Sequence, residues 1–157
     1  MNRFEDISEI RYSGFNGRAV LLRLIESIGY RFGRATLGLG GEHLEAQPVP
    51  GGMSLRRQIV HTGHLLQSAQ NVFTGRETPL EDWDVAGVLA GCDTLFRTVE
   101  AMSEAEIERC RTPVGGVLYL VNGPLSDALW HTGQISVYKK LLGISPSTGG
   151  FYKGGRA

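Results

Sequence analysis

Apolar side chains recur at intervals of three and four residues along most of the chain, and this spacing constrains the fold more than any other feature. In residues 14–39 the recurring positions are Leu21, Leu24, Ile28, Phe32, Ala35 and Leu39. Residues three or four apart share one face of an α-helix, so this segment is predicted to be an amphipathic helix. No strands alternate with the helical segments as a βαβ architecture would require. We therefore expect an all-α fold.

A second helix is predicted over residues 54–74. Ser54 can cap its N-terminus, and Gly75 supplies a C-terminal stop. The apolar stripe between them keeps helical period. It comprises Leu55, Ile59, Thr62, Leu66, Ala69 and Phe73.

Two more helices are predicted over residues 79–102 and 118–142. The third begins with Thr78-Pro79-Leu80-Glu81, which reads as a capping box with proline at the first helical position. The fourth is expected to kink at Pro124, because proline interrupts the hydrogen bonding of a helix interior. Residues 103–116 lose the helical period and predict a long crossover before the last helix, with a short extended piece. The predicted architecture is a four-helix bundle in a single domain, residues 1–157.

Charge and hydropathy narrow the classes of partner. Sixteen basic residues balance sixteen acidic ones, so neither a nucleic acid nor an anionic membrane is expected as a partner. The N-terminus lacks the apolar stretch of a secretory signal, and no apolar run reaches membrane-spanning length. We expect a soluble, cytoplasmic protein in which Cys92 and Cys110 are reduced structural thiols.

Asp127 and His131 are the first candidate functional pair. They lie four residues apart in the last helix, so both side chains project from one face and can reach one metal ion. Gln134 and Tyr138 continue this polar track, which suggests a lined cavity. The alternatives are a surface hydrogen-bonded pair and a track that faces water, as in an ordinary amphipathic helix.

Two segments resemble the DinB/YfiT-like superfamily. The segment NGPLSDALWHTGQISVYKKLLG, residues 122–143, is similar to that family's last helix, in which a His-x-x-x-His pair precedes Gly-Gln and the helix ends in Leu-x-Gly. The segment SLRRQIVH, residues 54–61, looks like its second helix, with a metal-ligating histidine seven residues after a serine cap. The helix order and the long connection before the last helix also agree with the family's bundle.

The resemblance implies a divalent-metal site formed by His61, Asp127 and His131. Asp127 stands where the family more often has the first histidine of its pair. Two histidines and one carboxylate suit Zn, Ni, Fe or Mn and leave open positions for water or substrate. His64 is a rival ligand, but it lies away from the apolar stripe and is better explained as a solvated histidine. His43 lies in a connecting loop and is expected at the surface.

Members of the superfamily are linked to metal-dependent chemistry on small thiols. The resemblance therefore implies an S-transferase-like enzyme in which the ion holds a low-molecular-weight thiol as thiolate, and Gln134 or Tyr138 orients a small-molecule substrate. The same open position could instead hold water for hydrolysis.

A non-enzymatic alternative is a small-molecule-binding or interaction module. In that case we expect a homodimer, with helix faces that carry Gly87 and Gly91 in contact. The C-terminal segment STGGFYKGGRA is either disordered or a flap anchored by Phe151 and Tyr152.

Overall fold

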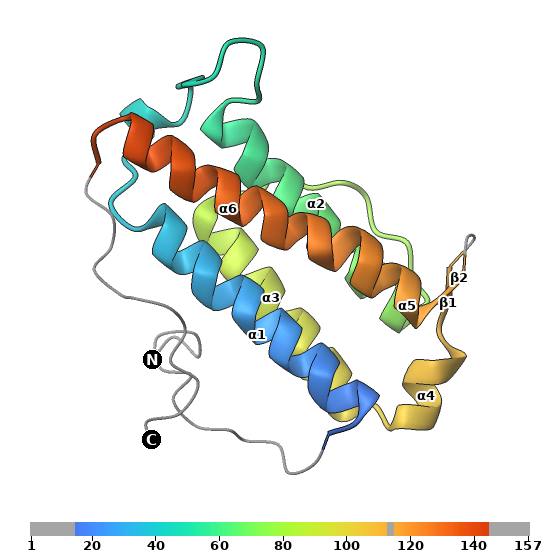
Figure 1. Ribbon diagram of the computed structural model, residues 1–157. Helices are drawn as coiled ribbons and strands as arrows, with labels where there is room; N and C mark the ends of the chain where they lie inside the picture. Colours follow the sequence, from blue (N-terminus) through green and yellow to red (C-terminus); the bar gives the residue numbers. More distant parts are fainter. Residues whose placement is uncertain (1–14, 113–114, 145–157) are drawn as a thin grey trace, which may run out of the picture.

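Four long helices form a bundle in which some neighbours are parallel and others antiparallel. The computed structural model describes residues 15–112 and 115–144. These helices are α1 (Gly17–Thr36), α2 (Leu55–Thr74), α3 (Val85–Ala101) and α6 (Ser126–Leu141) (Figure 1). The predicted all-α bundle is confirmed. The expectations for Phe151 and Tyr152 fall outside the described residues.

Each long helix packs against two others. α1 and α2 lie diagonally opposite, and each contacts both α3 and α6. Arg18 in the first turn of α1 donates to the carbonyl of Glu100 near the end of α3, so these two helices are antiparallel. Lys139 near the end of α6 donates to the carbonyl of Leu37, just beyond α1, so α1 and α6 are parallel. α2 and α3 run in the opposite direction to this pair (Figure 1).

The predicted apolar stripes form the core. All six stripe residues of α2 are buried, including Thr62, whose hydroxyl donates to the carbonyl of Gln58 at 2.8 Å. Ser54 caps this helix through the backbone N–H of Arg57, and Gly75 ends it in the left-handed conformation with φ of 65°. The largest fully buried apolar side chains are Phe32, Phe96, Leu22, Ile25, Ile28, Leu55, Leu66, Leu95, Leu120, Leu125 and Ile135.

The predicted start of the third helix at Pro79 is wrong, because α3 begins at Val85. Asp84 is its N-cap and accepts a hydrogen bond from the backbone N–H of Gly87 at 2.6 Å. The preceding residues, 75–84, run back along α2 in non-helical conformation. This segment connects the end of α2 with the start of α3, which is why these neighbouring helices are parallel.

Side chains of α2 bind the segment 75–84 and compete with helix formation there. The amide of Gln67 donates to the hydroxyl of Thr78 at 2.7 Å and also to the carbonyl of Pro79. His64 Nε2 lies 2.9 Å from the carbonyl oxygen of Glu81. These backbone oxygens would otherwise be available to the first turn of a helix, so tertiary contacts override the local capping signal.

The long connection before the last helix is present, but it joins α3 to α6 at one end of the bundle. It contains α4 (Glu104–Arg109), an antiparallel pair β1 (Arg111–Thr112) and β2 (Gly115–Gly116), and α5 (Val117–Leu120). The extended piece was predicted and α4 was not. The connection that runs the length of the bundle is therefore residues 75–84, between α2 and α3, and not the one before α6.

A kink separates α5 from α6. Residues 121–125 form a π-helical turn in which Gly123 has non-helical φ and ψ of −110° and −105°, directly before Pro124. The predicted break near Pro124 is confirmed. In the described part of the chain, no helix combines the length and the hydropathy that a membrane span requires.

Candidate metal centre

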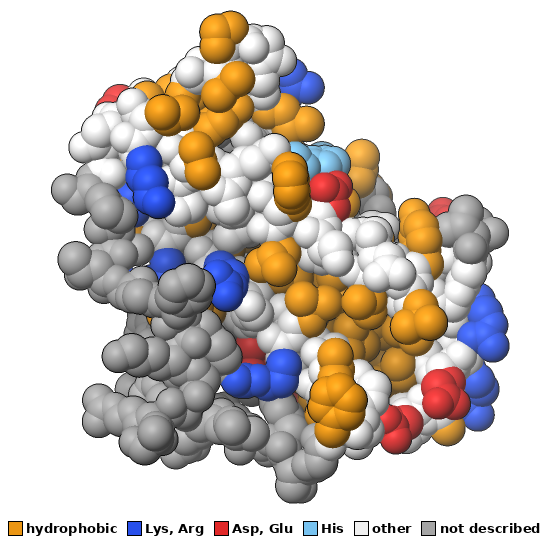
Figure 2. Space-filling model, viewed as in Figure 1, with side chains coloured by type: hydrophobic (Ala, Val, Ile, Leu, Met, Phe, Trp, Pro, Cys, Tyr) orange, Lys and Arg blue, Asp and Glu red, His pale blue; other side chains and the backbone are white. Residues whose placement is uncertain are grey.

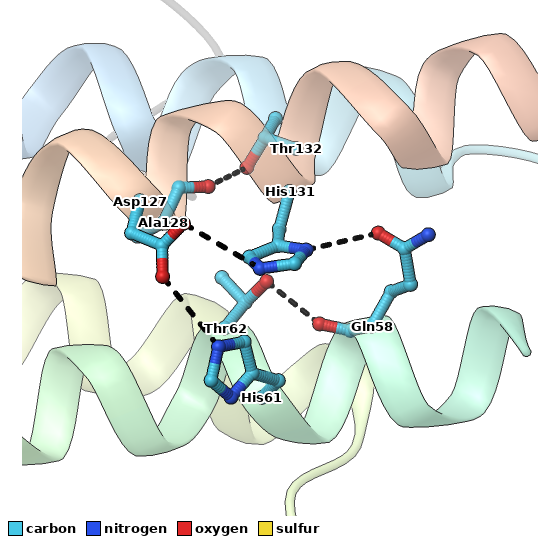
Figure 3. Close-up of polar contacts among 7 residues, drawn as sticks. All are labelled: Gln58, His61, Thr62, Asp127, Ala128, His131 and Thr132. Carbon is cyan, nitrogen blue, oxygen red and sulfur yellow. Dashed lines mark hydrogen bonds and ion pairs between the residues drawn. The ribbon is translucent and has the colours of Figure 1, made fainter. Parts of the chain in front are cut away.

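α2 and α6 carry the candidate ligands on their facing sides. His61 lies in the second turn of α2, while Asp127 and His131 lie one turn apart on α6. The two helices are antiparallel neighbours, so these three side chains point toward one another across the interface (Figure 3). The structure thus brings together all three residues that the sequence predicted as ligands.

Asp127 lies between the two imidazoles. Its Oδ2 is 3.6 Å from His61 Nε2, and its Oδ1 is 3.6 Å from His131 Nε2. One ligand atom from each of the three residues lies within 4.8 Å of the others. Metal–nitrogen and metal–oxygen bonds of about 2.0–2.2 Å place ligand atoms about 3–4 Å apart. The 3.6 Å distances match this spacing and the 4.8 Å limit is slightly wider, so the three residues could hold one small divalent ion.

The two histidine rings are arranged edge to face. Their centroids are 4.7 Å apart and their planes meet at 88°. This arrangement lets both Nε2 atoms approach the carboxylate without the rings stacking over each other. Both Nε2 atoms and the Asp127 carboxylate thus point toward the same small region between the two helices.

Gln58 fixes the orientation of His131. Its side chain is buried on α2, and its Oε1 lies 3.2 Å from His131 Nδ1. An amide oxygen only accepts hydrogen bonds, so Nδ1 donates and the lone pair of the neutral ring stays on Nε2, which faces Asp127 (Figure 3). Histidine ligands in metal sites commonly have such a partner on the second ring nitrogen. Gln58 therefore selects the tautomer that a metal ion requires.

Burial sets the charge of His131. Desolvation lowers its pKa and outweighs the nearby Asp127 carboxylate, which raises it; the His61 ring lowers it further. The pKa thus lies below the ordinary value of 6.5, so the ring is mainly neutral at pH 7. A neutral imidazole can bind a metal without first releasing a proton.

The site opens toward solvent on one side. The side chain of His131 is 10% exposed, whereas those of His61 and Asp127 are 38% and 46% exposed. On the face shown in Figure 2, a histidine surface lies directly beside a carboxylate, with hydrophobic side chains nearby. An ion bound here would be anchored on the buried side and accessible to a small molecule on the other.

The two candidates for orienting substrate lie in different places. Gln134 interacts with His131 and acts to raise its pKa, opposing the effect of burial, so it belongs to the cluster. Tyr138 is 7% exposed and packs against the loop before α2, where a Cβ on Gly52 would lie 2.5 Å from its hydroxyl. The structure does not bring Tyr138 to the candidate ligands.

The remaining histidines have partners elsewhere. His64 interacts with the carbonyl of Glu81, as described above, and is only partly exposed. His43 accepts a hydrogen bond at Nδ1 from the backbone N–H of Gly40 at 2.9 Å. Neither belongs to the group of possible metal ligands found among the described residues.

Gln58 was not singled out from the sequence, although a signal was present. It lies on the apolar stripe of α2, three residues after Leu55 and four before Thr62. A polar side chain in a buried stripe needs a hydrogen-bonding partner. The identity of that partner depends on how α6 packs on α2, which the sequence pattern of α2 alone does not contain.

Comparison with known proteins gives no relative from which function can be transferred. No protein-family model matches the chain, nor does any curated protein or solved structure. Membership of the DinB/YfiT-like superfamily therefore stays a prediction from two sequence segments. The arrangement of His61, Asp127 and His131 is the observation from which function is argued.

Proposed function

We propose that His61, Asp127 and His131 bind one divalent metal ion and that the chain is a metal-dependent enzyme of the DinB/YfiT-like type. The observation that carries this proposal is the convergence of three ligand atoms, within 4.8 Å of one another, from two facing helices. The neutral, oriented His131 supports it, because a solvated surface pair needs no buried partner such as Gln58.

The ligand set defines the class of metal. Two imidazole nitrogens and one carboxylate oxygen suit Zn, Ni, Fe or Mn, whereas calcium and magnesium prefer sites made of oxygen ligands. Three protein ligands also leave coordination positions for a small molecule. The partial exposure of His61 and Asp127 supports open coordination positions on the solvent side of the cluster.

The proposed reaction is transfer chemistry on a low-molecular-weight thiol. A bound divalent ion would lower the pKa of a coordinated thiol or water and so supply a nucleophile at neutral pH. In this scheme Gln58 holds His131 in the ligating tautomer, and Gln134 would orient a substrate, because it interacts with His131. The thiol itself is proposed from the family resemblance.

Metal titration of purified protein tests the site. Calorimetry with Zn and Ni on the chelator-treated wild type is expected to show one ion per chain. The variants His61→Ala and His131→Ala are expected to bind at least about tenfold more weakly, because each loses a ligand. His64→Ala is the matched control, since it removes a histidine from the same helix outside the cluster. Equal metal binding by all four proteins would contradict the proposed metal site.

Turnover assays then separate the reaction classes. Metal-loaded protein is incubated with a panel of small thiols and a chlorinated aromatic electrophile, and thioether formation is measured. Thiol-dependent turnover that His131→Ala abolishes supports the transferase proposal. Ester or amide hydrolysis without thiol would favour the hydrolase alternative, and metal binding without any turnover would favour a binding module.

A further inference from the structure

A cleft adjoins the candidate metal centre on its solvent side. It is an open cleft of about 460 Å³, lined by α2, by the kinked segment and by the start of α6. Asp127 is part of both the cleft wall and the ligand cluster. A molecule in this cleft would therefore lie directly against the group proposed to hold the ion. The volume is within the range of small-molecule sites.

The kink before α6 shapes one wall of the cleft. Non-helical dihedral angles at Gly123 turn α5 away from the axis of α6. The ring of Tyr119 packs over Gly123, where an added Cβ would lie 3.6 Å from two ring carbons. Ser126 donates to the carbonyl of Val121 and closes the turn on the other side. The position of the Tyr119 ring thus follows from the break in the helix.

Two aromatic side chains line this cleft and remain accessible. Trp130 is 67% exposed and Tyr119 is 45% exposed, although tryptophan is usually well buried in a protein of this size. Leu65, one turn beyond His61 on α2, adds an aliphatic contact. Exposed aromatic rings beside a polar cluster are typical of binding sites for planar apolar groups.

The charged side chains that line the cleft determine which ligands bind it poorly. Among the described residues that line it, Asp127 is the one charged side chain, and no lysine or arginine is present. In the metal-free protein, an anionic group would find no cationic partner in the lining and would be repelled by the Asp127 carboxylate. The amide of Asn122 offers a neutral hydrogen-bonding group instead.

We propose that the cleft between Tyr119 and Trp130 binds the uncharged aromatic portion of the substrate. Its role as a substrate subsite rests on the proposed metal-dependent function, because that function places the reacting atoms at Asp127. Binding of an aromatic compound to the cleft does not depend on metal. The two parts can therefore be tested separately.

Fluorine NMR of the full chain tests binding directly. The protein contains two tryptophans, Trp83 and Trp130, and both can be labelled as 5-fluorotryptophan. The Trp130→Phe variant assigns the resonances. In chelator-treated protein, benzamide is expected to shift the Trp130 resonance saturably and to leave Trp83 unchanged, because Trp83 packs against Gly63 and Gly91 outside the cleft. Benzoate, of similar size but anionic, is expected to bind more weakly.

Matched variants test the contribution of the aromatic wall. Trp130→Ala is expected to weaken benzamide binding about three- to tenfold, measured by saturation-transfer NMR on the ligand. Val137→Ala removes another exposed apolar side chain of α6 outside the cleft and should leave binding unchanged. Unsaturable or equal shifts at both tryptophans, or equal affinity in wild type and Trp130→Ala, would overturn the inference.

A pair of chelating probes links the cleft to the metal. In Zn-loaded protein, benzohydroxamate is expected to bind about three- to tenfold more tightly than acetohydroxamate, and Trp130→Ala should abolish that preference. Zinc binding without any preference for the aromatic probe would contradict the substrate subsite alone. Absence of zinc binding would contradict the proposed function, while the benzamide titration would still decide whether the cleft binds aromatic compounds.

Discussion

At the scale of single residues, Gln58 is expected to control metal affinity without touching the metal. Replacing it with leucine removes the acceptor for His131 Nδ1, so the ring loses its fixed tautomer. Gln58→Leu should therefore weaken Zn binding about 10- to 100-fold in a competition titration. Gln58→Glu keeps an acceptor and should retain tight binding.

A second buried glutamine of α2 provides the control for this change. Gln67 is 6% exposed and binds residues 78 and 79 instead of the ligand cluster. Gln67→Leu should lower the free energy of unfolding by about 1–3 kcal/mol and leave Zn affinity unchanged. Equal loss of Zn affinity in both leucine variants would show that Gln58 acts only through overall stability.

Asp127 can be compared with the histidine that the resemblance places there. Asp127→His offers an imidazole at the same helical position, so it should retain or strengthen Zn binding, as measured by calorimetry. Circular dichroism checks that the fold is intact. Loss of Zn binding in a folded Asp127→His protein would argue that Asp127 has a role other than replacing a ligand.

The two cysteines should differ sharply in reactivity. Burial raises the pKa of the Cys92 thiol from 9.0 to about 12, so about one molecule in ten thousand carries the thiolate at pH 8. In the Cys110→Ser variant, a thiol reagent should therefore react only after unfolding. In the Cys92→Ala variant, the partly exposed Cys110 should react in the folded protein. Rapid labelling of folded Cys110→Ser would contradict the burial of Cys92.

The shift at Cys92 also predicts the direction of a pH effect on stability. The folded thiol keeps its proton up to about pH 12, while the unfolded thiol releases it above pH 9.0. The contribution of this group to the free energy of unfolding is thus fully present below pH 9.0 and falls as pH rises toward 12. Comparing urea unfolding of wild type with Cys92→Ala across this window isolates the effect.

At the scale of helices, replacing glycine with alanine is expected to change the free energy of unfolding in opposite directions at two positions. An added Cβ at Gly63 in α2 would lie 2.1 Å from Cγ of Trp83, whereas Gly133 in α6 has nothing within 4 Å. Gly63→Ala should lower the free energy of unfolding by about 1–3 kcal/mol through overpacking. Gly133→Ala should raise it by about 0.5–1 kcal/mol, because alanine favours the helix. Urea unfolding curves measure both, and a shift of the same sign in the two variants would contradict the packing described.

The helical stripes could be predicted because they depend on local period, and α2 was predicted to within a residue. The start of α3 could not, because Gln67 and His64 bind the backbone of the segment that carried the capping signal. Gly91, one of the glycines predicted at a dimer contact, faces a side chain of its own chain. A Cβ on Gly91 would lie 3.0 Å from the Trp83 ring of the same chain. The start of α3 was thus decided by contacts with α2, whereas the homodimer stays a prediction.

In the candidate site, too, some residues could be predicted from local sequence and others depend on how the helices pack. Asp127 and His131 were predicted from their spacing on one helix, and His61 from the resemblance of its segment to a known helix. Gln58 and the cleft beside Trp130 depend on the packing of α2 against α6 and on the kink at Gly123, so neither follows from local pattern. Tyr138 shares the helix face of His131 but lies two turns away, beside the loop at Gly52.

At the scale of the whole molecule, a metal ion would connect two neighbouring helices and stabilise the entire bundle. Because the ligand cluster requires α2 and α6 in their folded positions, metal at a hundredfold excess over its Kd should add about 2.7 kcal/mol to the free energy of unfolding. For a chain of this length the melting temperature should rise by about 5–10 °C, measured by calorimetry. At the same metal concentration, His131→Ala should show about half of this rise or less, because its binding is at least about tenfold weaker, and His64→Ala should show all of it.

The diagonal placement of α1 and α2 has a kinetic consequence. Successive helices of this chain are not always neighbours, so much of the core joins residues that are far apart in sequence, and such contacts slow folding relative to a simple up-and-down bundle. The ligand cluster joins residues that are especially far apart in sequence, because His61 in α2 meets its partners only when α6, which ends at Leu141, has folded. During synthesis, the capacity to bind metal would appear only after α6 has been made and has packed on α2, so metal uptake would report that packing step.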